Sequence, residues 1–147
     1  MTLFAAIIAL MLGTVLTTQI GINKQLGESL NNLYIPALVN MAVGVVATFI
    51  ITSVATEQWP ARELVRQAPW YSWLGGVLGA GYLTAAILLA PRLGAAALIG
   101  LVVAGQLVFS VLVDHFGWIG FEQRDADLSR IAGCALMLVG VFLISRG

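Results

Sequence analysis

The sequence contains few charged residues: seven basic and seven acidic side chains among 147, or 10% of the chain. None of them lies in the middle of a long apolar run, and most fall in the short stretches between such runs. The formal net charge is zero. Because nucleic-acid binding needs an excess of positive charge, we expect no nucleic-acid partner. The low share of charged residues also argues against a soluble domain.

Metal ligands and reactive side chains are equally scarce. The chain has one histidine and one cysteine, Cys134, which lies inside an apolar run and cannot form a disulfide within the chain. This position is typical of a small packing residue, and a reactive or metal-binding role is the alternative. No group of His, Cys and carboxylates has metal-ligand spacing, and no nucleophile and base are suitably spaced. We therefore expect no metal, no cofactor and no enzymatic activity.

Long apolar runs make up most of the chain, which is 60% hydrophobic with a mean hydropathy of +0.97. A membrane-spanning helix needs roughly 20 apolar residues, and five runs approach this length. We predict an all-α integral membrane protein, with five transmembrane helices forming a bundle and a single domain over residues 1–147. The expected helices are 3–26, 35–55, 71–90, 94–114 and 130–146.

The ends of these runs carry recognisable signals. The first run could be a cleaved signal peptide, but no basic residue precedes it, so we expect a retained helix. Gly27 is expected to end that helix, and residues 91–94 to form a tight turn between the third and fourth. In the polar connection 56–71, residues 61–67 could form a short interfacial helix. Trp70 and Tyr71 are typical of the membrane–water boundary.

Basic residues are divided almost evenly between the two sides of a five-helix arrangement. One side would carry four and the other three, so the positive-inside rule gives almost no preferred orientation. Dual topology, with copies inserted both ways and paired antiparallel, is one interpretation, and a weakly biased single orientation is the other. The first side holds Arg62, Arg66, Arg124 and Arg130, and the second holds Lys24, Arg92 and Arg146.

Small residues indicate close helix contacts, because packing replaces the hydrophobic drive inside a bilayer. Gly75 and Gly79 form one small-xxx-small pair in the third expected helix, and Gly76 begins another. Gly133 and Gly140 are seven residues apart and share a face of the last helix. We expect these glycines to serve helix packing, with the last two as a candidate dimer seam.

Polar residues recur at helical spacing on three of the expected helices. An unpaired amide in hydrocarbon is costly, so these faces should meet one another or a wet cavity. Hydrogen bonding between helices as simple packing glue remains the alternative. The three sets are Gln19 with Asn23, then Asn40 with Gly44 and Thr48, and finally Gln106 with Ser110 and Asp114.

Asp114 and His115 form the one titratable pair next to a helix body. Their position at the end of the fourth expected helix favours an interfacial role over a buried proton relay. Because mid-helix carboxylates are missing, any coupling by protonation would have to use this pair, or else another ion would serve.

Several segments together resemble the YdcZ-like family of small bacterial inner-membrane proteins, within the drug/metabolite transporter superfamily. The resemblance covers nearly the whole chain. The segments that carry it are Pro69–Ala80, Pro91–Ala96, Gly105–Leu107, Asp114–Gly117 and Arg130–Gly133.

The resemblance implies a multi-pass protein of the bacterial inner membrane and half of a ten-helix transporter, whose two inverted halves enclose a substrate site. A lone half would then be completed by an antiparallel homodimer partner or a paralogous chain. The small multidrug-resistance branch of this superfamily uses a glutamate in its first helix, where this chain has Gln19 and no acid. Proton-coupled export of cationic drugs is therefore not expected.

The leading hypothesis is a dimeric transporter of a small metabolite or drug-like solute, working by alternating access within the lipid bilayer. An amide-rich pathway would suit polar solutes that are uncharged or zwitterionic. A non-transporting accessory or scaffold subunit is the alternative. The expected pathway residues are Gln19, Asn23, Asn40, Tyr82 and Gln106.

Overall fold

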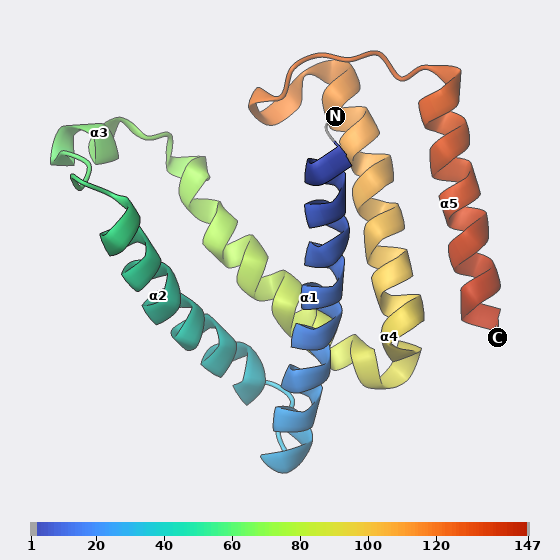
Figure 1. The fold of residues 1–147 in the computed structure, drawn as a ribbon, viewed down its shortest axis with the longest axis horizontal. Helices are drawn as coiled ribbons and strands as arrows, with labels where there is room; N and C mark the ends of the chain where they lie inside the picture. Colours follow the sequence, from blue (N-terminus) through green and yellow to red (C-terminus); the bar gives the residue numbers. More distant parts are fainter. Residues whose placement is uncertain (1–2, 147) are drawn as a thin grey trace. The chain divides into compact units, whose positions relative to one another are not determined.

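The computed structural model describes residues 3–146, and these residues form helices with no strand among them (Figure 1). Four helical segments are long and apolar enough to cross a membrane: α1, α2, the segment Trp70–Phe116 that contains α4, and α5. The prediction of an all-helical chain with membrane-spanning helices is therefore confirmed. The elements are α1 (Leu3–Ser29), α2 (Ile35–Ala55), α3 (Arg62–Gln67), η1 (Trp70–Trp73), α4 (Leu74–Phe116), η2 (Trp118–Gly120) and α5 (Leu128–Arg146).

The chain divides into two compact units, Met1–Pro91 and Arg92–Gly147. The first contains α1, α2, α3, η1 and the beginning of α4. The second contains the rest of α4, η2 and α5. Each unit is described by itself.

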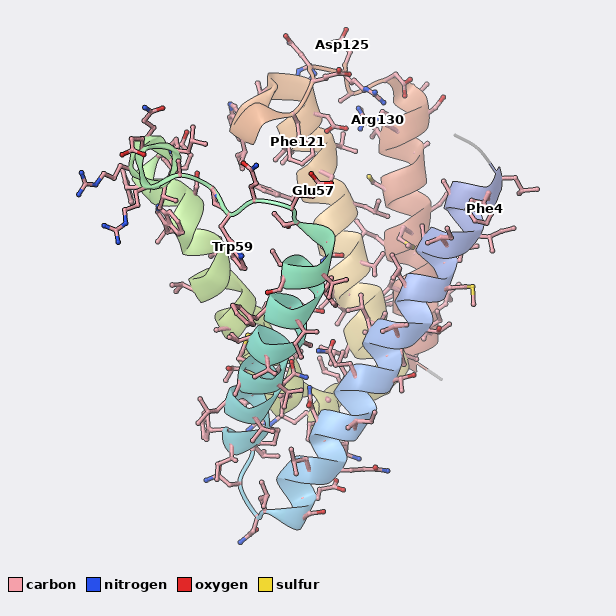
Figure 2. All side chains as sticks on the ribbon, turned by 60° about the vertical axis from the view of Figure 1, so that its left-hand side comes forward. Phe4, Glu57, Trp59, Phe121, Asp125 and Arg130 are labelled. Carbon is pink, nitrogen blue, oxygen red and sulfur yellow. The ribbon has the colours of Figure 1, made fainter. Side chains whose placement is uncertain are left out.

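In the first unit, α1 and α2 lie side by side next to the turn that joins them and diverge away from it (Figures 1 and 2). The turn follows a Schellman pattern, because Asn32 N–H donates to Gly27 O at 3.0 Å and Asn31 N–H donates to Glu28 O at 3.2 Å. Asn31 takes the left-handed conformation, with φ of 48°. Asn32 Oδ1 then accepts from the backbone N–H groups of Tyr34 and Ile35.

The helix expected over residues 3–26 is thus three residues longer at this end, and α1 ends at Ser29. Gly27 is helical and buried. A Cβ there would lie 3.2 Å from Leu33 and 3.3 Å from Pro36, so the neighbouring side chains pack closely against it. A left-handed asparagine ends the helix in place of the glycine. Gly27 instead allows the start of α2 to pack closely against α1.

The first unit has a small apolar core where α2 meets the beginning of α4. Ala37 of α2 clusters there with Leu83 and Ile87 of α4. Ile87 is completely buried, as is Pro36. Pro36 lies in the first turn of α2, where its missing N–H costs no helical hydrogen bond.

α4 is interrupted at Gly94, whose φ of 74° and ψ of 164° are not helical. Residues 91–93 are helical, including Pro91, so the turn expected over residues 91–94 is reduced to a change of direction at this one glycine. Without this break, 43 helical residues would extend roughly 65 Å. The hydrocarbon core is only about 30 Å thick.

Replacing Gly94 by alanine is expected to lower the free energy of unfolding by about 1–3 kcal/mol, because this backbone region is essentially restricted to glycine. Unfolding of the purified protein in detergent measures the effect. Gly105→Ala is the matched control, since Gly105 is helical and a Cβ there would have nothing within 4 Å. Equal stability of the two variants would show that alanine adopts the backbone conformation at position 94 without strain.

In the second unit, the part of α4 that follows Gly94 packs against α5 at Gly100. A Cβ on Gly100 would lie 3.1 Å from a methyl group of Val141, which is 4% exposed. Leu98, Ala104 and Val113 are the other buried apolar residues of this unit.

Most large apolar side chains are exposed on the chain itself. In the apolar 18-residue stretches of α1, α2 and α5, only 6% of the residues are buried. In the corresponding stretch of the segment Trp70–Phe116, 17% are buried. Contiguous apolar surface on this scale is incompatible with water. The helices therefore have to be covered by lipid or by other membrane-embedded protein.

Candidate functional site

Three amide side chains form a hydrogen-bonded chain between α1 and α2. Gln19 Nε2 donates to Asn40 Oδ1 at 3.1 Å, and Asn40 Nδ2 donates to Asn23 Oδ1 at 3.3 Å. Asn40 is the central member, since it both accepts and donates. Two turns of α1 supply Gln19 and Asn23, because residues four apart lie on the same face of a helix.

Asn23 is the most unusual member, because it is only 3% exposed. Its Nδ2 atom is buried and has no hydrogen-bond partner within the described residues. A buried polar group without a partner costs about 1–3 kcal/mol. This is the feature that packing alone does not explain.

The amide chain lines a cleft of about 340 Å³ in the first unit. Two adjacent rows of α1, each with four-residue spacing, supply most of the lining, and one residue of α2 supplies the rest. Lining residues cover about 14 Å along α1, since nine residues separate the first from the last. The residues are Thr14, Val15, Thr18, Gln19, Ile22, Asn23 and Asn40.

The two other expected pathway residues do not join this network within the described part of the chain. Tyr82 lies in the beginning of α4, is 40% exposed and is not among the cleft residues. Gln106 belongs to the second unit and is exposed. The structure thus brings together three of the five, and the roles of all five remain a prediction.

Asp114 and His115 have different partners in the second unit. Asp114 accepts from the guanidinium of Arg130, and both side chains are about three-quarters buried. His115 Nδ1 lies 3.3 Å from the backbone N–H of Ala126, which donates to it. Asp125 Oδ1 lies 3.7 Å from the same nitrogen.

These contacts attach the connection 117–127 to the ends of α4 and α5. Arg130 also donates to the backbone oxygen of Arg124 at 3.2 Å, and Arg124 N–H donates to Asp114 O at 2.8 Å. Asp127 Oδ1 accepts from Arg130 N–H at 2.8 Å and so caps the start of α5. Figure 2 shows Asp125 and Arg130 at this end of the unit. These contacts hold the connection 117–127 against the two helices, which is a structural role. A coupling role for Asp114 and His115 remains a prediction.

The comparison with known proteins decides the family. Over residues 4–143 the chain matches the family described as "Putative inner membrane exporter, YdcZ". The chain belongs to this YdcZ family. The inner membrane protein YdcZ of Escherichia coli strain K12 is 29% identical over 134 residues, which cover 91% of this chain and 89% of that protein. No solved structure matches the chain significantly.

Membership of the YdcZ family agrees with the apolar helices, and the protein is a multi-pass protein of the inner membrane. The resemblance stated from sequence segments is confirmed. The family description also indicates a membrane transporter, without naming its solute.

The glycines expected to pack helices of this YdcZ-family chain have open surroundings in it. A Cβ at Gly75, Gly76, Gly79, Gly133 or Gly140 would have nothing within 4 Å. Gly133 lines a groove of about 580 Å³ together with Cys134, Ser110 and Arg130. Contacts of these five glycines with another chain remain a prediction.

The sequence did not predict the structural roles of two residues, Arg130 and Gly100. In the sequence Arg130 is only one of the basic residues that bear on topology and part of the resemblance segment Arg130–Gly133, because spacing along a helix does not reveal its pairing with Asp114 across an irregular connection. Gly100 lies between apolar residues with no special spacing to other glycines, so only its contact with Val141 reveals it.

Proposed function

We propose that this YdcZ-family protein exports a small solute and that the cleft between α1 and α2 is part of the solute pathway. The observation that carries the proposal is the buried Asn23 amide nitrogen, which has no hydrogen-bond partner in the part of the chain that the structure describes, at a cleft lined by a chain of amides. A polar group is retained in an apolar membrane helix at a cost, and such residues mark solute pathways.

Each half of α4 has membrane-spanning length, with about 20 residues on either side of Gly94. In the proposed arrangement each half crosses the bilayer once, which gives five crossings in total. The chain is then half of a ten-helix transporter, as the family resemblance implies. An odd number of crossings requires an oppositely oriented partner to build an inverted pair.

The length of the cleft supports an antiparallel dimer. Its 14 Å extent along α1 corresponds to roughly half of the hydrocarbon core. Thr14 lies near the middle of α1, and Asn23 lies closer to the turn with α2. A second copy inserted the other way would supply a matching cleft on the opposite side, and rocking of one copy against the other would alternate access.

The dimer makes a prediction about orientation. With four basic residues on one side and three on the other, copies should insert both ways. Reporters fused after the last residue, one active only in the cytoplasm and one active only outside it, should therefore give comparable activity. Activity from one reporter alone would exclude the self-paired antiparallel dimer and leave a paralogous partner or a parallel assembly.

Export itself is tested by comparing the solutes in the medium of cells that produce the protein with those of cells that do not. At least one small solute should accumulate outside the producing cells and disappear faster from inside them. Identical media, with the protein present in the inner membrane, would contradict the proposed function.

A scaffold subunit is the second candidate, and it is favoured by the hydrogen bonds that the three amides make with one another. In that case the amides hold α1 and α2 together. Replacing one amide would then disrupt assembly. It would cause no transport defect, because a scaffold subunit does not transport.

A further inference from the structure

The cleft between α1 and α2 has no ionisable lining. Its residues are hydroxyl, amide and aliphatic side chains, with no acid, base or histidine among those described. Lys24 follows Asn23 in sequence but is not a cleft residue, and its ammonium lies 3.4 Å from the carboxylate of Glu28. A charged solute would enter the cleft without a counter-charge. Such a charge is expensive at membrane depth.

The hydrogen-bond donors that are left in the cleft belong to its amide side chains, and the Asn23 donor is the buried one. The hydroxyl groups of Thr14 and Thr18 donate to Met11 O at 2.7 Å and to Thr14 O at 2.8 Å, which leaves their oxygens as acceptors. Gln19 gives an N–H to Asn40, and Asn40 gives one to Asn23. Both N–H groups of Asn23 then remain at the end of the chain.

This polarity defines what would complement the site. An acceptor, such as a carbonyl or hydroxyl oxygen, would satisfy Asn23 when the cleft admits a solute. Donors on the same solute could reach the hydroxyl oxygens of Thr14 and Thr18. A buried polar group that rejects a ligand without the matching group gives stronger selectivity than apolar contacts do.

We infer that the solute is uncharged and carries a carbonyl or hydroxyl acceptor that pairs with the Asn23 amide. This inference rests on the proposed export function and adds the class of substrate. It narrows the expectation from the sequence, which included zwitterions, because neither charge of a zwitterion would find a partner in the cleft.

The test uses one skeleton in four charge states, with the purified full chain in lipid nanodiscs at about pH 6, where an α-amino group is protonated. The probes are N-acetyl-leucinamide (neutral), leucinamide (cationic), N-acetylleucine (anionic) and leucine (zwitterionic), together with the glycine and alanine analogues for size. Binding is measured as the rise in Tm with probe concentration. The neutral members should raise Tm at concentrations at least tenfold lower than their charged relatives do.

Asn23→Asp has the same shape as the native residue but replaces the donor by a carboxylate. It should lose the response to the neutral probes and gain a response to leucinamide. Asn23→Leu is the second variant, suited to an apolar helix, and should lose the neutral response without gaining the cationic one. Thr48→Val is the matched control on α2, because Thr48 Oγ1 donates to Gly44 O in its own helix and lies outside the cleft.

The outcomes separate the substrate class from the function. If a charged probe binds the wild type best and this binding is lost in Asn40→Leu, the substrate class is wrong and the pathway stands. If no neutral member binds, or if the neutral probes bind Asn23→Leu as they bind the wild type, the inference is overturned. Identical media in the export comparison would overturn the proposed function as well.

Discussion

Asn40→Leu is expected to reduce solute export by about tenfold or more while the protein still inserts and assembles. Asn40 holds the centre of the amide chain, so its loss leaves Gln19 without its acceptor and Asn23 without its donor. These two bonds position the cleft amides, and a hydrogen bond of this kind contributes about 1 kcal/mol, so losing both corresponds to about tenfold or more. Leucine has similar size and favours membrane insertion, so we expect the stability to fall by only about 1–2 kcal/mol.

Export is measured in the medium of producing cells, and assembly by the size of the detergent-solubilised protein. Thr48→Val is again the control, since it removes a hydroxyl group from α2 that, among residues 3–146, bonds within its own helix. Full export by Asn40→Leu would remove the cleft from the pathway. Loss of assembly in this variant, with Thr48→Val intact, would favour the scaffold interpretation.

Arg130→Gln should have the second large effect, a fall of about 2–4 kcal/mol in the free energy of unfolding. The substitution leaves the carboxylate of Asp114, which is 24% exposed, without its cation. The expected cost lies between those of exposed and fully buried ion pairs. It also removes the hydrogen bond to the Arg124 backbone oxygen, and so releases the connection 117–127.

The double variant Asp114→Asn/Arg130→Gln should recover most of this loss, because no unpaired charge remains. Arg124→Gln is the matched control. Its side chain is 71% exposed and 3.5 Å from Glu122, and such pairs contribute little. Thermal unfolding in detergent should therefore rank Arg124→Gln near the wild type, the double variant below it and Arg130→Gln lowest. An unchanged Tm for Arg130→Gln would show that Asp114 needs no partner.

The amide chain shows how far sequence patterns reach. Spacing of four residues placed Gln19 and Asn23 on one face, and the cost of unpaired amides predicted that this face would meet another polar face. The structure supplies the partner, Asn40, and also an asymmetry, in which the Nδ2 donor of Asn23 has no partner among the described residues. Side-chain hydrogen-bond direction depends on how two helices pack, and spacing within one helix does not encode it.

Other features depend on backbone geometry or on contacts between distant residues. The sequence Pro91-Arg92-Leu93-Gly94 predicts a break between two helices, and the structure has one. The dihedral angles show that the break lies at Gly94 alone. Asn31, and not Gly27, ends α1, because Gly27 is needed where α2 packs against it. The Asp114–Arg130 pair spans 16 residues across an irregular connection, which residue spacing cannot register.

The most direct test of the account is the water accessibility of the cleft in the membrane. Thr18→Cys and Leu16→Cys, each on a Cys134→Ala background, place single thiols at nearly the same depth on α1. Thr18 lines the cleft, whereas Leu16 is 47% exposed on the chain and is not a cleft residue. A charged, membrane-impermeant methanethiosulfonate reagent reacts with a hydrated thiolate and not with a thiol in lipid. The reagent should modify the Thr18→Cys protein several times faster than the Leu16→Cys protein. Equal protection of both thiols would contradict a solute pathway between α1 and α2.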